Sequence, residues 1–351
     1  MRPRENVPLA PYCTMGVGGP ARYFLEAADE ATVLEAVEWT RRRGLSLHAL
    51  GGGSNVVIAD EGVDGLVLRI AVRGLTERPG GAGVEVTAAA GEPWDDFVQT
   101  TVTRGWAGLE CLSGIPGLVG ATPIQNVGAY GQEVAETITS VRAVERATGR
   151  VVTLSPADCG FGYRRSALKE APSPPIVLAV SFRLEPGGPP ALRYADVVKD
   201  LERRRIASPS LADVRRSVLD IRRAKSMVLD AADPNGRTCG SFFLNPIVSA
   251  ADLSRVERSA GRDASMPRWP ERDGRVKLSA AWLIEQAGFA RGRPEGPVGL
   301  STRHTLAIVC RDGAGTRDVA AFARTVRARV EERWGVRLVP EPDFWGPIGL
   351  D

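Results

Sequence analysis

Two glycine-rich stretches carry residue types that suit an anionic or nucleotide-like ligand. The first, LGGGSNVVI at 50–58, places three glycines before Ser54 and Asn55. Glycines can form a tight turn whose N–H groups converge on an anion, to which the two polar side chains add donors. This loop joins two expected strands, so neither the dinucleotide-fold fingerprint nor a GxxxxGK[ST] phosphate loop applies. An ordinary hairpin turn is the alternative.

The second stretch, 113–131, mixes small, apolar and amide or hydroxyl residues with almost no charge. An ordinary surface loop would be expected to carry Asp, Glu or Lys. This composition suits a backbone packed against a large, flat ligand with polar edges. Two such loops before one domain boundary favour a single extended cofactor.

The remaining composition excludes several classes of protein. With 45 Lys and Arg against 42 Asp and Glu, the net charge of +3 is too balanced for a protein that tracks nucleic-acid phosphates. No signal peptide or long apolar run occurs, which predicts a cytoplasmic protein without membrane insertion. The five cysteines lack metal-ligand spacing, and only His48 and His304 could help them, so we expect free thiols and no metal. The cysteines are Cys13, Cys111, Cys159, Cys239 and Cys310.

Hydrophobic periodicity predicts the elements that position these loops. A length of 351 residues predicts two domains, or three small ones, with a boundary near 220–238. One helix is expected to begin after Asp29 and end at Gly44. Other helices are expected at 94–105, 278–288 and 318–334, and strands at 21–27, 45–50, 56–58, 65–70, 83–90, 140–146, 150–154, 176–184 and 304–310.

The stretch 185–192 reads as an exposed connector, and 195–227 as a basic helical region. A solvated helix face or a hairpin lid explains such a run of arginines, and phosphate binding is the alternative.

Six motifs in one order carry a family resemblance. They are GGGSN at 51–55, GIPGLVGATPIQNVGAYG at 114–131, FGYRRS at 161–166, GSFFLNP at 240–246, KLSAAWLIEQAGF at 277–289 and PEPDFWG at 340–346. With them, the chain resembles the UDP-N-acetylenolpyruvoylglucosamine reductase family from about residue 9 to residue 346.

The resemblance implies an α+β fold with a two-lobed FAD-binding domain of the vanillyl-alcohol-oxidase (PCMH) type. This domain would span 1–228, with lobes at about 1–75 and 76–228 and the basic helical lid at 195–227. A smaller α/β substrate-binding domain would follow at 229–335. The tail, 336–351, would return a catalytic glutamate to the active site.

The implied reaction belongs to peptidoglycan precursor synthesis. NADPH reduces non-covalently bound FAD and leaves, and the enolpyruvyl ether of UDP-N-acetylglucosamine then receives hydride on its terminal methylene carbon. The product is UDP-N-acetylmuramate. The expected partner is therefore a small-molecule UDP-sugar rather than nucleic acid, and the protein is expected to be a monomer.

Three residues match catalytic positions of the family. Arg164, with its planar charged fork, would clamp a carboxylate and polarise the enolate. Ser241 would donate a proton to the carbanion, and Glu341 would help polarise the enolpyruvyl group. Without the resemblance, Arg164 reads as part of a surface basic pair with Arg165. Ser241 then reads as a turn or N-cap residue, and Glu341 reads as a surface acid.

The resemblance also assigns binding residues. The expected cofactor-binding residues are Gly51, Gly52, Gly53, Ser54, Asn55, Gly120, Ala121, Thr122, Asn126, Gly128, Ala129 and Tyr130, and the expected substrate-binding residues are Tyr194, Lys225 and Asn245.

The chain departs from the family pattern in three places. Cys310 stands where the strand usually ends in Asn, and Cys239 occupies a small-residue position two residues before Ser241. The linker between Lys225 and Gly240 is longer than in the family's shorter members. A harmless exchange and a reactive thiol near the proton donor are both open readings of the cysteines.

Three other functions remain to be distinguished. A paralogue could reduce a related nucleotide-sugar enol ether. An FAD-dependent oxidase could tether flavin through His48 or Cys111, although the GSFF and PEPDFWG matches argue against it. A non-catalytic sensor would be expected to have lost at least one of the three catalytic residues.

Overall fold

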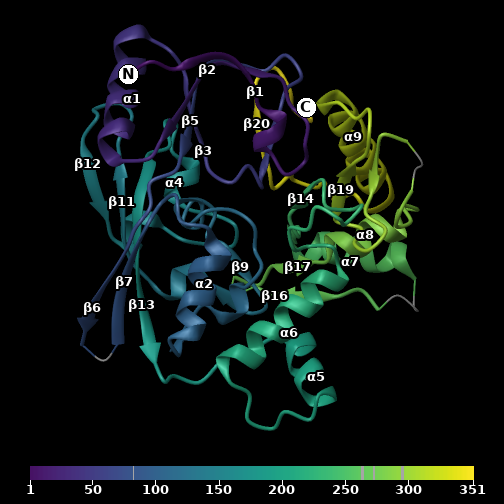
Figure 1. Cartoon of the computed structure of the whole chain (residues 1–351). Coiled ribbons are helices and arrows are strands. Elements are labelled where there is room, and N and C mark those ends of the chain that lie inside the picture. Colours follow the sequence, from purple (N-terminus) through teal and green to yellow (C-terminus); the bar gives the residue numbers. More distant parts are fainter. Residues whose placement is uncertain (82, 262–264, 272, 294–295) are drawn as a thin grey trace. The chain divides into compact units, whose positions relative to one another are not determined.

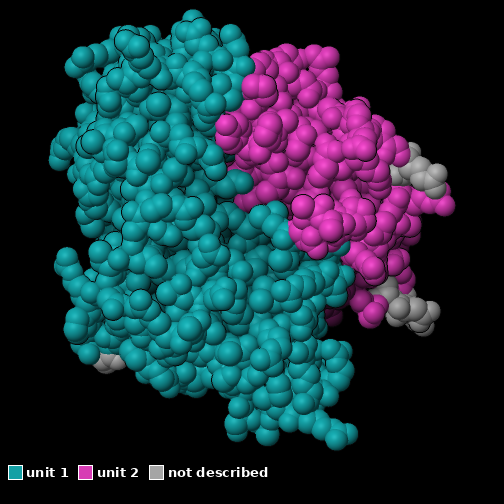
Figure 2. Space-filling view, viewed as in Figure 1, with its two compact units in different colours: residues 1–7, 21–52, 64–229 teal, residues 8–20, 53–63, 230–351 magenta. Residues whose placement is uncertain are grey.

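The computed structural model describes residues 1–81, 83–261, 265–271, 273–293 and 296–351. The contacts within this part of the chain divide it into two units, coloured separately in Figure 2. Unit 1 comprises Met1–Val7, Ala21–Gly52 and Asp64–Leu229, and unit 2 comprises Pro8–Pro20, Gly53–Val63 and Asp230–Asp351. The resemblance places 8–20 and 53–63 in the first lobe, but in the structure both segments pack in unit 2.

The first lobe of unit 1 is a small sheet packed against α1 (Glu30–Arg43) (Figure 1). The Asp29 carboxylate accepts a 2.7 Å hydrogen bond from the Thr32 N–H and caps the first turn of the helix. Gly44, with φ 62°, ends the helix in the left-handed conformation. Both predicted ends are confirmed. The sheet has the order β1 (Arg4–Pro8), β2 (Pro20–Ala27), β5 (Val63–Ile70) and β3 (Leu47–Leu50).

The second lobe of unit 1 is an antiparallel sheet backed by α2 (Trp94–Thr103). Aromatic side chains form the centre of its core. The ring centroids of Phe97 and Phe182 lie 5.2 Å apart, and the Trp94 ring packs against both. Their complete burial contributes much of the lobe's apolar stabilisation. The sheet order is β12 (Val151–Leu154), β11 (Ile138–Val144), β13 (Ile176–Pro186), β7 (Gly83–Ala89) and β6 (Leu75–Gly80), and β8 (Trp106–Ala107) also pairs with β13.

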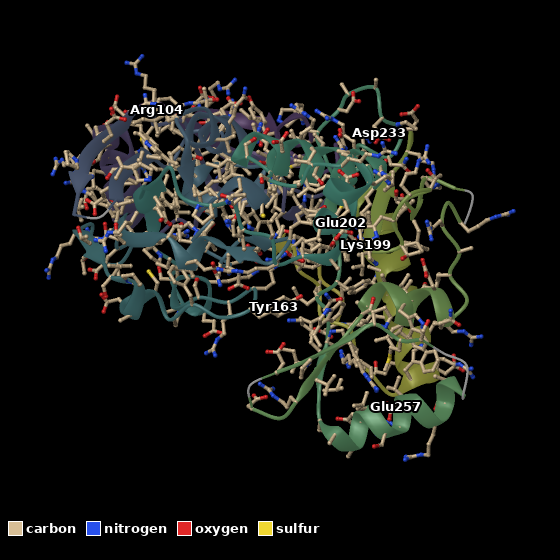
Figure 3. All side chains as sticks on the ribbon, turned by 90° about the horizontal axis from the view of Figure 1, so that it is seen from below. Arg104, Tyr163, Lys199, Glu202, Asp233 and Glu257 are labelled. Carbon is tan, nitrogen blue, oxygen red and sulfur yellow. The ribbon has the colours of Figure 1, made fainter. Side chains whose placement is uncertain are left out.

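The basic region forms two helices, α5 (Ala195–Arg203), marked by Lys199 and Glu202 in Figure 3, and α6 (Leu211–Ala224). An apolar cluster that includes Val197, Leu201, Val214 and Val218 holds them together. Most of the basic side chains pair with nearby acids, which favours the reading as a solvated helix face. These pairs are Arg203–Asp200, Arg204–Asp200, Arg204–Asp220, Arg215–Asp95, Arg216–Asp213, Arg223–Asp220 and Lys225–Asp196.

Unit 2 packs small sheets against α7 (Ala250–Ala260), α8 (Ala280–Gln286) and α9 (Thr316–Trp334). The buried Trp334 indole N–H donates a 3.0 Å hydrogen bond to the Leu283 carbonyl, which joins α9 to α8. A parallel pair, β4 (Val56–Ile58) with β20 (Asp343–Trp345), joins an early segment to the tail. The other sheets are β14 (Thr238–Ser241), β19 (Ala307–Cys310) and β18 (Val298–Leu300), and β15 (Ile247–Val248), β17 (Val276–Leu278) and β16 (Arg268–Pro270).

Short elements complete the described chain, and within the described ranges every helix is too short or insufficiently apolar to span a lipid bilayer. These elements are η1 (Ala10–Tyr12), η2 (Glu110–Leu112), η3 (Val119–Ala121), β9 (Gly128–Ala129), β10 (Gln132–Glu133), η4 (Val134–Glu136), α3 (Pro156–Cys159) and α4 (Ala167–Glu170).

Candidate cofactor and active site

The two glycine loops meet in unit 1. A Cβ atom added at Gly52 would lie 2.9 Å from the Gly117 Cα atom, and one at Gly51 would lie 3.8 Å from the Leu118 side chain. A side chain at position 52 would therefore push the loops apart. This close backbone approach supports the interpretation that both loops serve one extended ligand.

The rest of the first loop belongs to unit 2, where Thr14 and the tail residues Glu341 and Asp343 hold it. Gly53 has φ 63°, and its carbonyl accepts a 3.0 Å hydrogen bond from the Thr14 N–H. The Asn55 amide donates to the Glu341 carbonyl at 3.3 Å, and the Asn55 carbonyl accepts from the Asp343 N–H at 3.1 Å. Ser54, between Gly53 and Asn55 in the loop, is partly buried. The tail that carries Glu341 therefore also supports the expected pyrophosphate loop.

Gly53→Ala is expected to destabilise the protein by roughly 2 kcal/mol or more, because a left-handed alanine costs about 1–2 kcal/mol and its Cβ would also lie 1.9 Å from the Tyr12 carbonyl oxygen. Urea unfolding with and without FAD measures the loss. Gly44→Ala is the matched control, since it has φ 62° and its Cβ would meet no described atom within 4 Å. Equal destabilisation by the two variants would show that the close approach at Gly53 has no energetic consequence.

The second loop is held by its own polar residues. The Gly120 N–H donates to the Ala90 carbonyl at 2.9 Å, and a Cβ at Gly120 would lie 2.5 Å from that alanine's Cβ. The Thr122 hydroxyl donates to the Val119 carbonyl, whereas Ala121 is exposed. Thr122 therefore shapes the loop backbone, and its direct contact with a cofactor stays a prediction.

Asn126 is the central support of the loop's second half. Its φ is 47°, and its side chain is almost completely buried. The amide donates to the Glu133 carboxylate at 2.7 Å and to the Gly162 carbonyl at 3.0 Å, while its oxygen accepts from the Ala135 N–H at 3.2 Å. These bonds connect the loop to the hairpin that carries Arg164.

Arg164 lies at the tip of a tight hairpin in unit 1. Gly162 and Arg165 exchange backbone hydrogen bonds of 3.0 and 3.1 Å, which leaves Tyr163 and Arg164 as the turn. Arg164 has φ 52°, and its Nη2 donates to the Gly128 carbonyl at 2.8 Å. Arg165 instead makes an exposed ion pair with Glu170. The structure thus separates two adjacent arginines that the sequence alone treats alike.

Tyr194 and Lys225 lie near one another on the helix pair of unit 1. Tyr194 is the residue before α5. Its ring packs edge-on against the Tyr130 ring, with 5.2 Å between the two ring centroids. The Lys225 Nζ lies 3.8 Å from the Asp196 carboxylate, close to the start of the same helix. Tyr130, with φ 50°, directly follows Gly128 and Ala129 of β9. Two expected substrate residues, Tyr194 and Lys225, thereby lie in the same unit as the expected cofactor residue Tyr130, and Tyr194 contacts it.

Arg222 is a residue of this region that the sequence analysis missed. It is only 8% exposed, it lies close to Tyr130, and its Nη2 donates a 2.6 Å hydrogen bond to the Met227 carbonyl. Its Nε atom has no hydrogen-bond partner among the described residues. Burial lowers the pKa of the guanidinium, and a buried cation of this kind favours a nearby anion. The four-residue spacing from Val214 and Val218 placed Arg222 on the apolar face of α6 and could have revealed it.

Ser241 and Glu341 come together in unit 2. Between Thr238 and Ser241 the pairing of β14 with β19 shifts register, and Gly240 has φ 79° within this β-bulge. Bulges redirect the side chain that follows. The Glu341 N–H donates to the Phe242 carbonyl at 2.9 Å, so the tail runs beside the GSFF segment.

Asn245 has a defined structural partner. Its side-chain oxygen accepts a 3.0 Å hydrogen bond from the Ala280 N–H and thereby supports the first turn of α8. A contact with substrate would therefore use its NH₂ group.

The cysteines are protonated packing residues. All five, each among the described residues, are free and buried. Burial raises the pKa of Cys239, and it raises the pKa values of Cys310 and Cys111 to about 12. A thiolate at these positions is disfavoured, so the reading of Cys239 as a reactive thiol is not supported. Burial and Arg146 lower the pKa of His48.

The residues present fit a large flavin cofactor. Glycines at 52, 117 and 120 allow backbone approaches that a side chain would block, and the loop 113–131 presents no carboxylate that would repel a pyrophosphate. These residues suit a cofactor that lies against the backbone without a covalent bond to the protein. The buried, protonated Cys111 thiol, which donates to the Ala191 carbonyl at 3.3 Å, offers no nucleophile for tethering.

Comparison with known proteins identifies both halves of the chain. Residues 21–155 match the model of an FAD binding domain, and residues 232–345 match the model described as UDP-N-acetylenolpyruvoylglucosamine reductase, C-terminal domain. Proteins named UDP-N-acetylenolpyruvoylglucosamine reductase match nearly the whole chain. The one from Saccharopolyspora erythraea is 50% identical, covering 97% of this chain and 95% of that protein. The one from Thermobifida fusca is 47% identical, covering 97% of this chain and 98% of that protein.

A solved structure shows the same architecture. The UDP-N-acetylenolpyruvylglucosamine reductase (MurB) of Thermus caldophilus superimposes with a TM-score of 0.67 at 25% sequence identity, covering 99% of this chain and 100% of that chain. The expected α+β fold with an FAD-binding portion is confirmed, and the oxidase alternative is not favoured. Since both family models and near-full-length relatives agree, this chain belongs to the UDP-N-acetylenolpyruvoylglucosamine reductase family of FAD-containing oxidoreductases.

Proposed function

We propose that Arg164, Ser241 and Glu341 carry out the reduction of the enolpyruvyl ether of UDP-N-acetylglucosamine enolpyruvate to UDP-N-acetylmuramate. The observation that carries this assignment is the pairing of the tail with the GSFF segment, through the 2.9 Å hydrogen bond from the Glu341 N–H to the Phe242 carbonyl. It brings together two motif residues that are far apart in the sequence. Bound FAD supplies the hydride, which it takes from NADPH.

The chemical need at the site is to stabilise negative charge and then deliver a proton. Addition of hydride to the terminal methylene leaves charge on the neighbouring carbon and its carboxylate. The Arg164 guanidinium presents a planar fork to that carboxylate, and its hydrogen bond to the Gly128 carbonyl orients the fork. The Ser241 hydroxyl then donates its proton to the carbon, and the Glu341 carboxyl group polarises the enolpyruvyl group.

The remaining residues bind cofactor and substrate. Gly51 to Asn55 bind the FAD pyrophosphate, and the loop containing Gly120 to Tyr130 lines the rest of the cofactor. Tyr194, Lys225 and the Asn245 amide bind the UDP-sugar, with Lys225 attracting the diphosphate once it exchanges Asp196 for the ligand. Arg222 adds a buried positive charge beside Tyr130. The protein acts as a monomer in the cytoplasm, a reducing compartment consistent with its free cysteines.

Anaerobic stopped-flow absorbance tests this function on the FAD-loaded protein. NADPH is expected to bleach the flavin band, and subsequent addition of the enolpyruvyl UDP-sugar is expected to restore it within one turnover. Related UDP-linked enol ethers are the comparison substrates. Reoxidation by one of them but not by UDP-N-acetylglucosamine enolpyruvate would overturn the proposed substrate in favour of a paralogue's reaction.

A further inference from the structure

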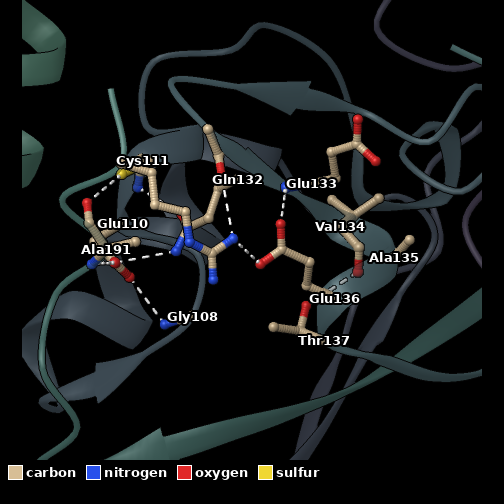
Figure 4. Close-up of polar contacts among 12 residues, drawn as sticks. Gly108, Glu110, Cys111, Gln132, Glu133, Val134, Ala135, Glu136, Thr137 and Ala191 are labelled. Carbon is tan, nitrogen blue, oxygen red and sulfur yellow. Dashed lines mark hydrogen bonds and ion pairs between the residues drawn. The ribbon is translucent and has the colours of Figure 1, made fainter. Parts of the chain in front are cut away.

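A buried carboxylate ties together three separate segments of unit 1. Glu110, in η2, is 1% exposed and Gln132, in β10, is 3% exposed. Glu110 accepts hydrogen bonds from the Gly108 N–H at 2.9 Å, the Gln132 side-chain NH₂ at 3.0 Å and the Ala191 N–H at 2.7 Å (Figure 4). In all three contacts the Glu110 side chain accepts from an N–H group. Gln132 in turn accepts from the Cys111 N–H at 2.9 Å.

One of these segments is the connector, residues 187–194, that runs from β13 to Tyr194. Besides the bond from the Ala191 N–H, the Ala191 carbonyl accepts from the Cys111 thiol at 3.3 Å. Arg193 donates to the Gly131 carbonyl at 3.3 Å and pairs with Glu136 at 2.8 Å. The connector lacks regular secondary structure, so these contacts fix its backbone where a sheet or helix would otherwise do so.

The other side of the cluster reaches the Arg164 hairpin. Gln132 and Glu133 of β10 pair with Ala129 and Gly128 of β9, and the Gly128 carbonyl is the acceptor for Arg164. The same β9–β10 turn contains Tyr130, whose ring contacts Tyr194. A shift of the connector would thus alter the contact between these two tyrosines.

We propose that Glu110 and Gln132 form a clasp that fixes the connector and thereby sets the position of Tyr194 beside Tyr130. They are positioning residues, since they act through the connector, and the inference rests on the proposed substrate-binding role of Tyr194. If Glu110 and Gln132 only stabilised the core of the lobe, their loss would affect all parts of the lobe to a similar extent. The clasp instead joins the lobe to the one segment that delivers Tyr194 and the lid helices. Loosening it therefore weakens substrate binding without affecting reduction of the flavin by NADPH.

Glu110→Gln is the sharpest test because it preserves size but replaces one acceptor oxygen with an NH₂ donor. That donor must face the N–H of either Ala191 or Gly108. Hydrogen exchange on the full-length FAD-loaded protein without substrate is expected to show at least about tenfold faster exchange at Ala191 and its connector neighbours. The KM for the enolpyruvyl substrate is expected to rise about tenfold, with flavin reduction by NADPH within about twofold of wild type.

Two further variants keep the test decisive if Glu110→Gln folds poorly. Gln132→Leu keeps both backbone bonds to Glu110, and it is expected to give a smaller rise in KM and in exchange. Glu136→Gln removes the exposed ion pair with Arg193 and keeps a side-chain oxygen that can accept from the Glu133 N–H, and KM is expected to change by less than about twofold.

Two results would overturn the clasp. One is unchanged connector exchange in Glu110→Gln and Gln132→Leu. The other is a KM rise in these variants no larger than that in Glu136→Gln. Because exchange is measured without substrate, failure of the clasp is distinct from failure of the proposed function, which would appear as absent turnover in the wild type.

Discussion

Ser241→Ala is expected to leave flavin reduction by NADPH within about twofold of wild type but to slow reoxidation by the enolpyruvyl substrate about 10³-fold. General acid catalysis contributes about 10²–10⁴ in rate, and alanine provides no proton. Ser241 follows the β-bulge at Gly240 and lies next to the residue that binds the tail, which suits a role at the reacting carbon. Single-turnover stopped-flow absorbance measures the two half-reactions separately.

Ser249→Ala is the control for this prediction. Ser249 caps α7 in the same unit, so its loss is expected to cost about 1 kcal/mol of stability without changing either half-reaction. Ser241→Ala that slows both half-reactions equally would contradict the proton-donor role, because a proton donor acts only after the substrate has entered.

Arg164→Met is expected to lower kcat/KM for the enolpyruvyl substrate about 10³-fold, because the developing charge loses a preorganised cation. Arg164→Lys restores only part of this loss, since a lysine ammonium is a point charge without a planar fork. Both variants keep an ordinary side chain at φ 52°, so the backbone strain of the turn is held constant. Reduction of the flavin by NADPH is the internal reference.

Arg165→Met provides a neighbouring control. Arg165 pairs with Glu170 at the surface, and exposed pairs contribute about 0–1 kcal/mol, so kcat/KM is expected to stay within about twofold of wild type. If the Arg165 variant lost more activity than the Arg164 variant, the assignment of the catalytic arginine would have to be reversed.

Local signals explain why much of the fold could be predicted from sequence. Asp29 and Gly44 define the ends of α1 through interactions within a few residues, and the alternating pattern of 176–184 identifies the core of β13. The strand β6 (Leu75–Gly80) was missed because it is exposed and contains proline, and α7 was missed because Val256 is its only fully buried apolar residue among those described.

Features that depend on distant segments could not be predicted. Nothing local shows that 53–63 packs with the tail, because the parallel pairing of β4 with β20 joins residues far apart in the chain. Likewise, adjacent arginines look alike in sequence. Only the hairpin directs Arg164 to Gly128 and leaves Arg165 at the surface. The Glu110 clasp is similarly non-local, since its donors come from η2, β10 and the connector.

The discontinuity of unit 2 determines the order in which its segments can come together during synthesis. Asn55 of the first glycine loop is hydrogen-bonded to Glu341, 286 residues later, and its carbonyl accepts a hydrogen bond from the Asp343 N–H. The ribosome must therefore release the tail from its exit tunnel before β20 can pair with β4. The sheets of unit 1 can form earlier, but the first glycine loop gains these two supports only after the tail has been synthesised.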